Sequence, residues 1–161
     1  LVLSVILVYM VMASQFESLL HPFTILLTIP LALVGAVLLF FVTGTTINIM
    51  GVIGVIMLSG IAVNNSIILV DRINQIKGDY DRLTDAIVVA ASQRIRPILM
   101  TSLTTILSLL PMAITFGEGA SLRAPMAIAV IGGLVTSTFL SLVVIPCVYY
   151  LLEQMKRKVM G

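Results

Sequence analysis

Two adjacent asparagines, Asn64 and Asn65, lie within an apolar stretch that ends at Asp71. An amide in apolar surroundings is costly unless it finds a hydrogen-bond partner, so both side chains should face protein rather than lipid. One helix face would carry, at helical spacing, Gly60, Asn64, Ile67 and Asp71. Asn64 would then lie about 10 Å from Asp71 along the axis. This polar stripe is typical either of helix–helix contacts or of a proton or ion route.

A second segment that could do chemistry runs from Arg94 to Ser102. Arg94 and Arg96 can reach phosphate groups if they lie at a membrane edge. Thr101 and Ser102 follow Pro97 by about one turn, and their hydroxyls can bond to carbonyls of their own helix or turn toward the polar stripe. A hydroxyl both donates and accepts, which suits a hydrogen-bonded relay.

The residue types needed for catalysis are scarce in this sequence. There is one histidine, His21, and it stands beside Pro22, where we interpret it as a helix-boundary residue. No His-Glu-x-x-His pattern occurs, and no Ser–His or paired-Asp arrangement lies within the apolar stretches. We therefore expect no enzyme, no cofactor and no metal-ligand set. The single cysteine, Cys147, excludes a disulfide within the chain.

The composition indicates which solvent surrounds these residues. Of 161 residues, 60% are apolar and 10% are charged, and the mean hydropathy is +1.19. No Asp, Glu, Lys or Arg lies between Glu17 and Asp71, and none lies within 97–117 or 124–152. Such stretches exceed what a soluble core requires, so the sequence predicts a membrane protein.

The apolar stretches predict an all-α fold, an integral membrane bundle of five transmembrane helices plus one cytoplasmic amphipathic helix. A membrane crossing needs about 20 apolar residues. We expect spans, the first of them short, over 1–16, 22–42, 47–70, 97–116 and 125–151. The amphipathic helix is expected over 79–93 along the inner membrane surface, capped by Asp79 or Asp81, although a solvated connector would also fit. Pro97 should open its helix, whereas Pro30, Pro111 and Pro146 should bend theirs or free a carbonyl.

Basic residues predict the orientation, because short loops that carry them stay cytoplasmic. The connection 71–96 holds five basic residues, namely Arg72, Lys77, Arg82, Arg94 and Arg96. The tail adds Lys156, Arg157 and Lys158. We interpret the net charge of +2 as a topology signal and expect the lipid bilayer, not nucleic acid, as the partner.

These motifs carry a resemblance to a known family. The run from Gly60 to Asp71, followed by the run from Arg94 to Ser102, resembles the resistance-nodulation-division (RND) efflux transporters, hydrophobe and amphiphile branch. The resemblance implies that 1–161 forms spans eight to twelve, the C-terminal half of the membrane domain of a larger transporter. The N-terminal membrane half and the periplasmic domains would lie outside this chain. It further implies a homotrimer in the bacterial inner membrane, with a periplasmic adaptor as a candidate partner.

The family resemblance also implies roles for individual residues. Thr101 matches the relay threonine, Arg94 matches the first arginine of an Arg-x-Arg-Pro motif, and Asn64 stands where many drug exporters have lysine. Proton flux would pass through an acidic pair on a helix outside this chain. Our hypothesis is that Asn64, Asn65 and Thr101 bond to that pair and sense its protonation. Asp71 fits a helix-end anchor or a proton entry point.

Other functions are compatible with the same residues. A metal-ion exporter or another RND branch is one alternative, although the methionines are scattered and are typical of packing. A passive channel or a structural helical module is another, in which the polar stripe would be a pore wall or a packing seam.

Overall fold

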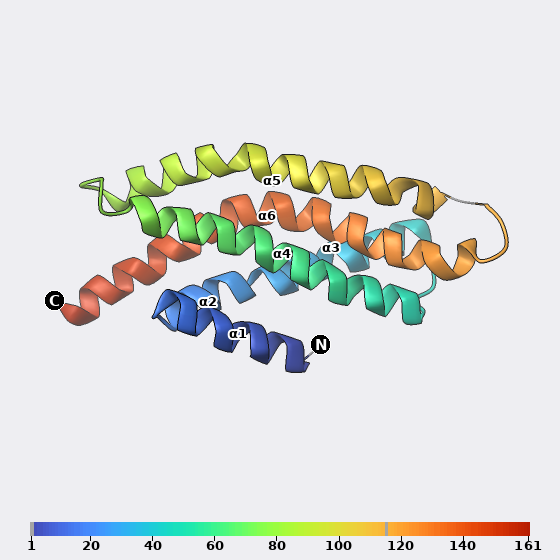
Figure 1. Cartoon of the computed structure of the whole chain (residues 1–161), viewed down its shortest axis with the longest axis horizontal. Coiled ribbons are helices and arrows are strands. Elements are labelled where there is room, and N and C mark those ends of the chain that lie inside the picture. The colour runs from blue at the N-terminus through green and yellow to red at the C-terminus, as the bar shows by residue number, and fades with distance from the viewer. Residues whose placement is uncertain (1, 115) are drawn as a thin grey trace.

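The computed structural model describes residues 2–114 and 116–161, which form a bundle of helices (Figure 1). Within these residues the helices are α1 (Val2–Phe16), α2 (Leu20–Leu26), α3 (Thr28–Thr43), α4 (Ile49–Ile76), α5 (Leu83–Ile114) and α6 (Ala120–Met160). The long helices α4, α5 and α6 run side by side along the length of the molecule (Figure 1). The prediction of an all-helical chain is therefore confirmed for the described residues.

Helices α2 and α3 form one apolar stretch that is broken at Leu27. Pro30 has no N–H with which to bond the carbonyl of Leu26, so the helix cannot continue regularly at this point. The hydroxyl of Thr28 donates to the carbonyl oxygen of Ile25 at 2.6 Å and satisfies one acceptor beside the break. The irregularity expected at Pro30 is thus present as a one-residue break at Leu27, whereas Pro111 and Pro146 lie within the continuous helices α5 and α6.

Four helical stretches are long and apolar enough to cross a membrane, namely Leu20–Thr43, Ile49–Ile76, Leu83–Ile114 and Ala120–Met160. They contain the last four predicted spans except for residues 47, 48 and 116, which the structure describes outside the helices, and position 115, which lies outside the described residues. The first predicted span, 1–16, begins at another undescribed position. Its helix α1 has 15 residues and a length of about 22 Å, less than the hydrocarbon thickness of about 30 Å.

The expected helix over 79–93 requires correction. The structure has one unbroken helix, α5, which starts at Leu83 and passes through Pro97, so Pro97 lies inside a helix rather than at its start. Residues 79–82 precede this helix, and Asp85 is the acidic residue of its first turn. Ala86, Ile87 and Ala90 are buried in the core cluster, and this packing keeps the amphipathic part in line with the rest of α5.

Helix α6 packs against α3, α4 and α5 and holds the bundle together. Glycines make two of these contacts close: a Cβ on Gly132 would lie 2.8 Å from the carbonyl oxygen of Gly35, and a Cβ on Gly54 would lie 2.7 Å from that of Met126. Small residues let membrane helices approach in this way. Gly60 behaves differently, because a Cβ there would meet nothing within 4 Å.

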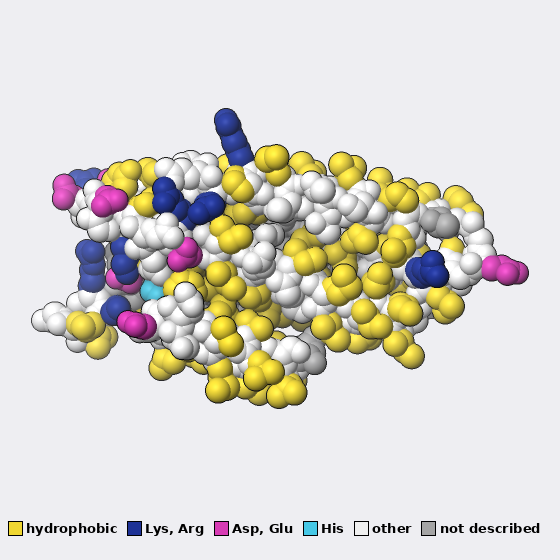
Figure 2. Space-filling view, in the orientation of Figure 1, with side chains coloured by type: hydrophobic (Ala, Val, Ile, Leu, Met, Phe, Trp, Pro, Cys, Tyr) yellow, Lys and Arg dark blue, Asp and Glu magenta, His cyan; other side chains and the backbone are white. Residues whose placement is uncertain are grey.

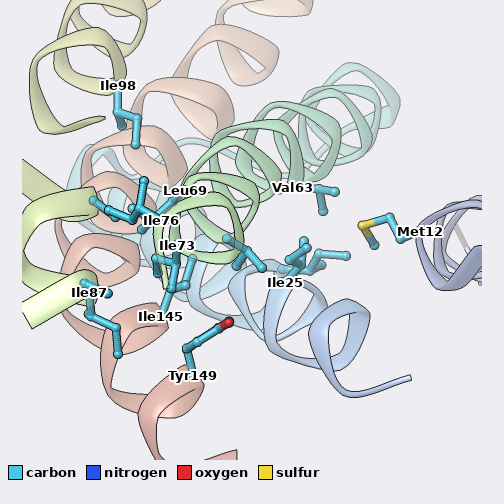
Figure 3. Packing of buried hydrophobic residues seen from close by; sticks show 14 residues of the cluster. Met12, Ile25, Val63, Leu69, Ile73, Ile76, Ile87, Ile98, Ile145 and Tyr149 are labelled. Carbon is cyan, nitrogen blue, oxygen red and sulfur yellow. The ribbon is translucent and has the colours of Figure 1, made fainter. Parts of the chain in front are cut away.

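Charged side chains gather at the end of the bundle that holds the α4–α5 connection and the C-terminal turns of α6 (Figure 2). We call this the charged end. The opposite end carries Glu118 and Arg123 near the start of α6, and hydrophobic side chains dominate the surface between (Figure 2). Near the charged end, Ile73, Ile145 and Tyr149 pack in one buried cluster from α4 and α6 (Figure 3).

Candidate functional site

The two adjacent asparagines of α4 face different sides of the helix. Successive residues of an α-helix project about 100° apart. Asn64 is exposed and lines a groove between α1 and α4, whereas Asn65 is only 8% exposed and faces α5 and α6. One amide therefore points out of the bundle and the other points into it.

The groove beside Asn64 has a volume of about 460 Å³. Its walls are mostly apolar side chains of α1 and α4, and Met12 and Val63 face one another across it (Figure 3). Ser59 also lines the groove, but its hydroxyl donates to the carbonyl oxygens of Val55 and Ile56, each at 2.9 Å. Asn64 is thus a free amide in an apolar groove within the described chain.

The polar stripe expected on α4 is present on the surface. Gly60, Asn64 and Ile67 line the same groove, which confirms that they share a face. Asp71 lies further toward the charged end, is half-buried, and accepts a hydrogen bond of 2.8 Å from Nε2 of Gln75. The Asp71 carboxylate is therefore bonded within its own helix.

The Thr101 hydroxyl bonds to carbonyl oxygens of its own helix and does not turn toward the polar stripe on α4. Its side chain is exposed, and its hydroxyl lies 2.8 Å from the carbonyl oxygen of Pro97 and 3.0 Å from that of Ile98. Ser102 points inward instead, and its hydroxyl lies 2.9 Å from that of Thr138 on α6. The residue after Thr101 thus makes the contact between helices.

The five candidate residues do not form one cluster. Within residues 2–114 and 116–161, no hydrogen bond joins any two members of the set Asn64, Asn65, Arg94, Thr101 and Asp71. Arg94 is half-buried on α5. The described part of the chain also brings together no three His, Cys, Asp or Glu side chains that could hold a metal ion.

The sequence did not predict two polar arrangements, a cluster of hydroxyl groups on α6 and a stacked His21–Tyr149 pair. Ser137, Thr138 and Ser141 of α6 gather beside Asn65, and their spacing within an uncharged run was the available signal. His21 is at a helix boundary as expected, but it is also 8% exposed and stacks on Tyr149, with ring centroids 5.2 Å apart. No spacing rule connects positions 21 and 149.

The comparison with known families decides what kind of protein holds these residues. A model of the AcrB/AcrD/AcrF family matches residues 1–153. The chain belongs to that family. This confirms the resemblance to RND efflux pumps, and with four apolar helices of sufficient length it makes the chain a multi-pass membrane protein.

Relatives and solved structures agree with this assignment. The "Swarming motility protein SwrC" of Bacillus subtilis (strain 168) is 38% identical over 159 residues, which cover 98% of this chain and 15% of the relative. Two crystal forms of a heavy metal efflux pump superpose with TM-scores of 0.84 and 0.83 at 36% and 34% identity. They cover 93% and 96% of this chain and 15% of the pump. The chain thus spans about 15% of the length of these relatives.

Proposed function

We propose that this chain is the C-terminal membrane part of a proton-driven RND exporter and that it responds to proton binding on helices outside the chain. The observation that carries the proposal is the exposed amide of Asn64 in a mostly apolar groove between α1 and α4. A polar group facing lipid costs free energy, so a further helix that offers a polar partner is the favourable neighbour.

The chemistry of an amide suits this role without a charge. Asparagine donates through its NH₂ group and accepts through its carbonyl oxygen. It can therefore donate to a carboxylate and accept from a carboxylic acid, so its hydrogen bond changes direction when the acid takes up a proton. A lysine at this position would instead change an ion pair, since its ammonium group only donates.

Thr101 on α5 also supports the proposed response to proton binding. Its hydroxyl proton is directed at carbonyl oxygens of its own helix, and its side chain is exposed. A hydroxyl oxygen has two lone pairs, so Thr101 can still accept a hydrogen bond from a protonated acid. In this proposal Asn65 supports α4 from within the bundle, and Arg94 and Asp71 act near the charged end.

The test uses the complete transporter that carries this segment. Asn64→Leu and Thr101→Val should each lower proton-coupled export on the order of tenfold, because each removes a hydrogen bond to a charged or protonating group. Export is measured as the efflux rate of a fluorescent amphiphile from energised cells. Thr104→Val is the matched control: Thr104 is exposed on the same helix and bonds to the carbonyl oxygen of Met100 at 2.7 Å. Equal export by all three variants would reject the proposed coupling.

The energy source distinguishes a coupled exporter from a passive channel. Collapsing the proton gradient with a protonophore should abolish export by the complete transporter, because the proposed cycle needs proton entry at each turn. Undiminished flux after the collapse would instead support a channel, in which the stripe on α4 is a pore wall. The measurement is the efflux rate before and after the protonophore is added.

For the substrate we propose amphiphilic compounds, and heavy-metal ions are the second candidate. Heavy-metal ions are favoured by the similarity to the two solved structures described as a heavy metal efflux pump, at 36% and 34% identity. Tolerance of expressing cells to detergents and dyes, compared with tolerance to transition-metal salts, separates the two. The proposal further places the transporter in the bacterial inner membrane as a homotrimer, with a periplasmic adaptor as partner.

A further inference from the structure

A small cavity lies between α4, α5 and α6, and both apolar and polar side chains line it. Its volume is about 10 Å³. Four polar side chains line it, namely Asn65, Ser137, Thr138 and Ser141. All four are buried, with exposed fractions between 2% and 8%. The cavity is distinct from the groove that holds Asn64.

The amide of Asn65 is the group that needs an occupant. It can make several hydrogen bonds, with two N–H donors and one carbonyl acceptor. Within residues 2–114 and 116–161 it makes no hydrogen bond to another protein group, and neither does the hydroxyl of Ser141. No side-chain nitrogen or oxygen among these residues is both fully enclosed and unpaired, so the polar atoms of Asn65 and Ser141 keep access to the cavity. Buried polar groups in proteins are almost always satisfied by protein atoms or by ordered water.

Size and chemistry select the occupant. A cavity needs at least about 10 to 15 Å³ and two to four polar partners to hold one water molecule, and this cavity is at the lower end of that range. We propose that this cavity binds a single buried water, which bonds to the amide of Asn65 and to the hydroxyls of Ser141 and Thr138. The water is part of the protein in the same sense as a buried side chain.

This water joins three helices. The hydroxyls of Thr138 on α6 and Ser102 on α5 already lie 2.9 Å apart. The water therefore completes a hydrogen-bonded chain that starts at Asn65 on α4, passes through Thr138 and ends at Ser102. Both ends are adjacent in sequence to the proposed coupling residues, Asn64 and Thr101. Only this link to coupling rests on the proposed function; the water site itself does not.

The test is a density map of the complete transporter at a resolution that shows ordered water. The wild-type map should contain one peak within about 2.7 to 3.2 Å of the Asn65 amide and of the Ser141 hydroxyl. Asn65→Leu has a similar size and no polar atoms, so the peak should be lost. Ser108→Ala should keep the peak, because Ser108 is exposed and bonds to the carbonyl oxygen of Thr104 at 2.6 Å.

Two results would overturn the proposal. One is a wild-type map without a peak, in which the Asn65 amide bonds directly to Ser137 or Ser141. The other is a peak with more and shorter oxygen contacts, as a bound cation has. The wild-type map decides the matter even if a variant fails to fold. If the water is present while Asn64→Leu and Thr101→Val export normally, the proposed function fails and the water site stands.

Discussion

Tyr149 connects three helices through one side chain at the charged end. Its ring on α6 stacks on the ring of His21 of α2 with an interplanar angle of 10°. His21 in turn contacts Phe16 of α1 edge to face, with ring centroids 6.0 Å apart. Its hydroxyl donates to Oδ1 of Asn74 on α4 at 2.6 Å. Since Tyr149 is 1% exposed, this bond satisfies a phenol that water reaches poorly.

Removing that hydroxyl should destabilise the bundle. We expect Tyr149→Phe to cost about 1 kcal/mol, because Asn74 loses a hydrogen-bond donor while the ring contacts are kept. The midpoint of chemical denaturation in detergent measures the change. Tyr150→Phe is the matched control: its hydroxyl accepts from Nε2 of Gln154 at 2.6 Å in an exposed setting. A loss as large for Tyr150→Phe as for Tyr149→Phe would contradict the assignment.

Single residues could be predicted only in part. The sequence placed Asn64 and Asn65 on one helix, and helix geometry required them to face different sides. Which one faces inward depends on where α6 crosses α4, and that crossing depends on contacts between distant glycines and side chains. For the same reason the polar residues that line the cavity beside Asn65, which lie more than 70 positions later, were not predictable.

Among the helices, the α3–α6 contact depends most on small residues. The carbonyl oxygen of Gly35 would lie 2.8 Å from a Cβ on Gly132, which leaves no room for a methyl group. Gly132→Ala should therefore cost about 1 to 3 kcal/mol of stability, because the helices must move apart. Gly60→Ala should instead be neutral or stabilise α4 by up to about 1 kcal/mol, since its Cβ would enter open space.

Denaturation midpoints of these two variants check the prediction together. Both replace glycine by alanine inside a helix, so they share the same change in helix propensity and differ in the surrounding contacts. Similar midpoints for both would mean that the close α3–α6 approach does not limit stability.

Helices were predictable where the chain is free of charge. The uncharged runs located α3, most of α4, the second half of α5 and most of α6, because only apolar helices of this length suit a bilayer. The continuity of α5 was not predictable. Pro97 and the charges before it indicate a helix start, whereas the packing of Ala86, Ile87 and Ala90 in the core extends the helix back to Leu83.

Across the whole molecule, charge separates the two ends. Fourteen of the sixteen charged residues lie at or near the charged end, and the other two are Glu118 and Arg123. Basic residues in short connections favour the cytoplasmic side. We therefore predict that the charged end is cytoplasmic.

Cysteine labelling tests this orientation. In a Cys147→Ala background, Tyr80→Cys lies in the α4–α5 connection and Ser121→Cys lies in the first turn of α6. An impermeant maleimide added outside should label only Ser121→Cys, whereas a permeant maleimide should label both. Labelling of Tyr80→Cys alone from outside would show the opposite orientation.

Because α5 is one unbroken helix, its two ends move together as a rigid body. Eighteen residues separate Leu83 from Thr101, about 27 Å along the axis. If the helix tilts as a rigid rod by roughly 5° about Thr101, Leu83 moves sideways by about 2 Å. A hinge at Pro97 would have absorbed such a tilt. A small tilt of α5 at Thr101, within the membrane, would thus displace the connection between α4 and α5.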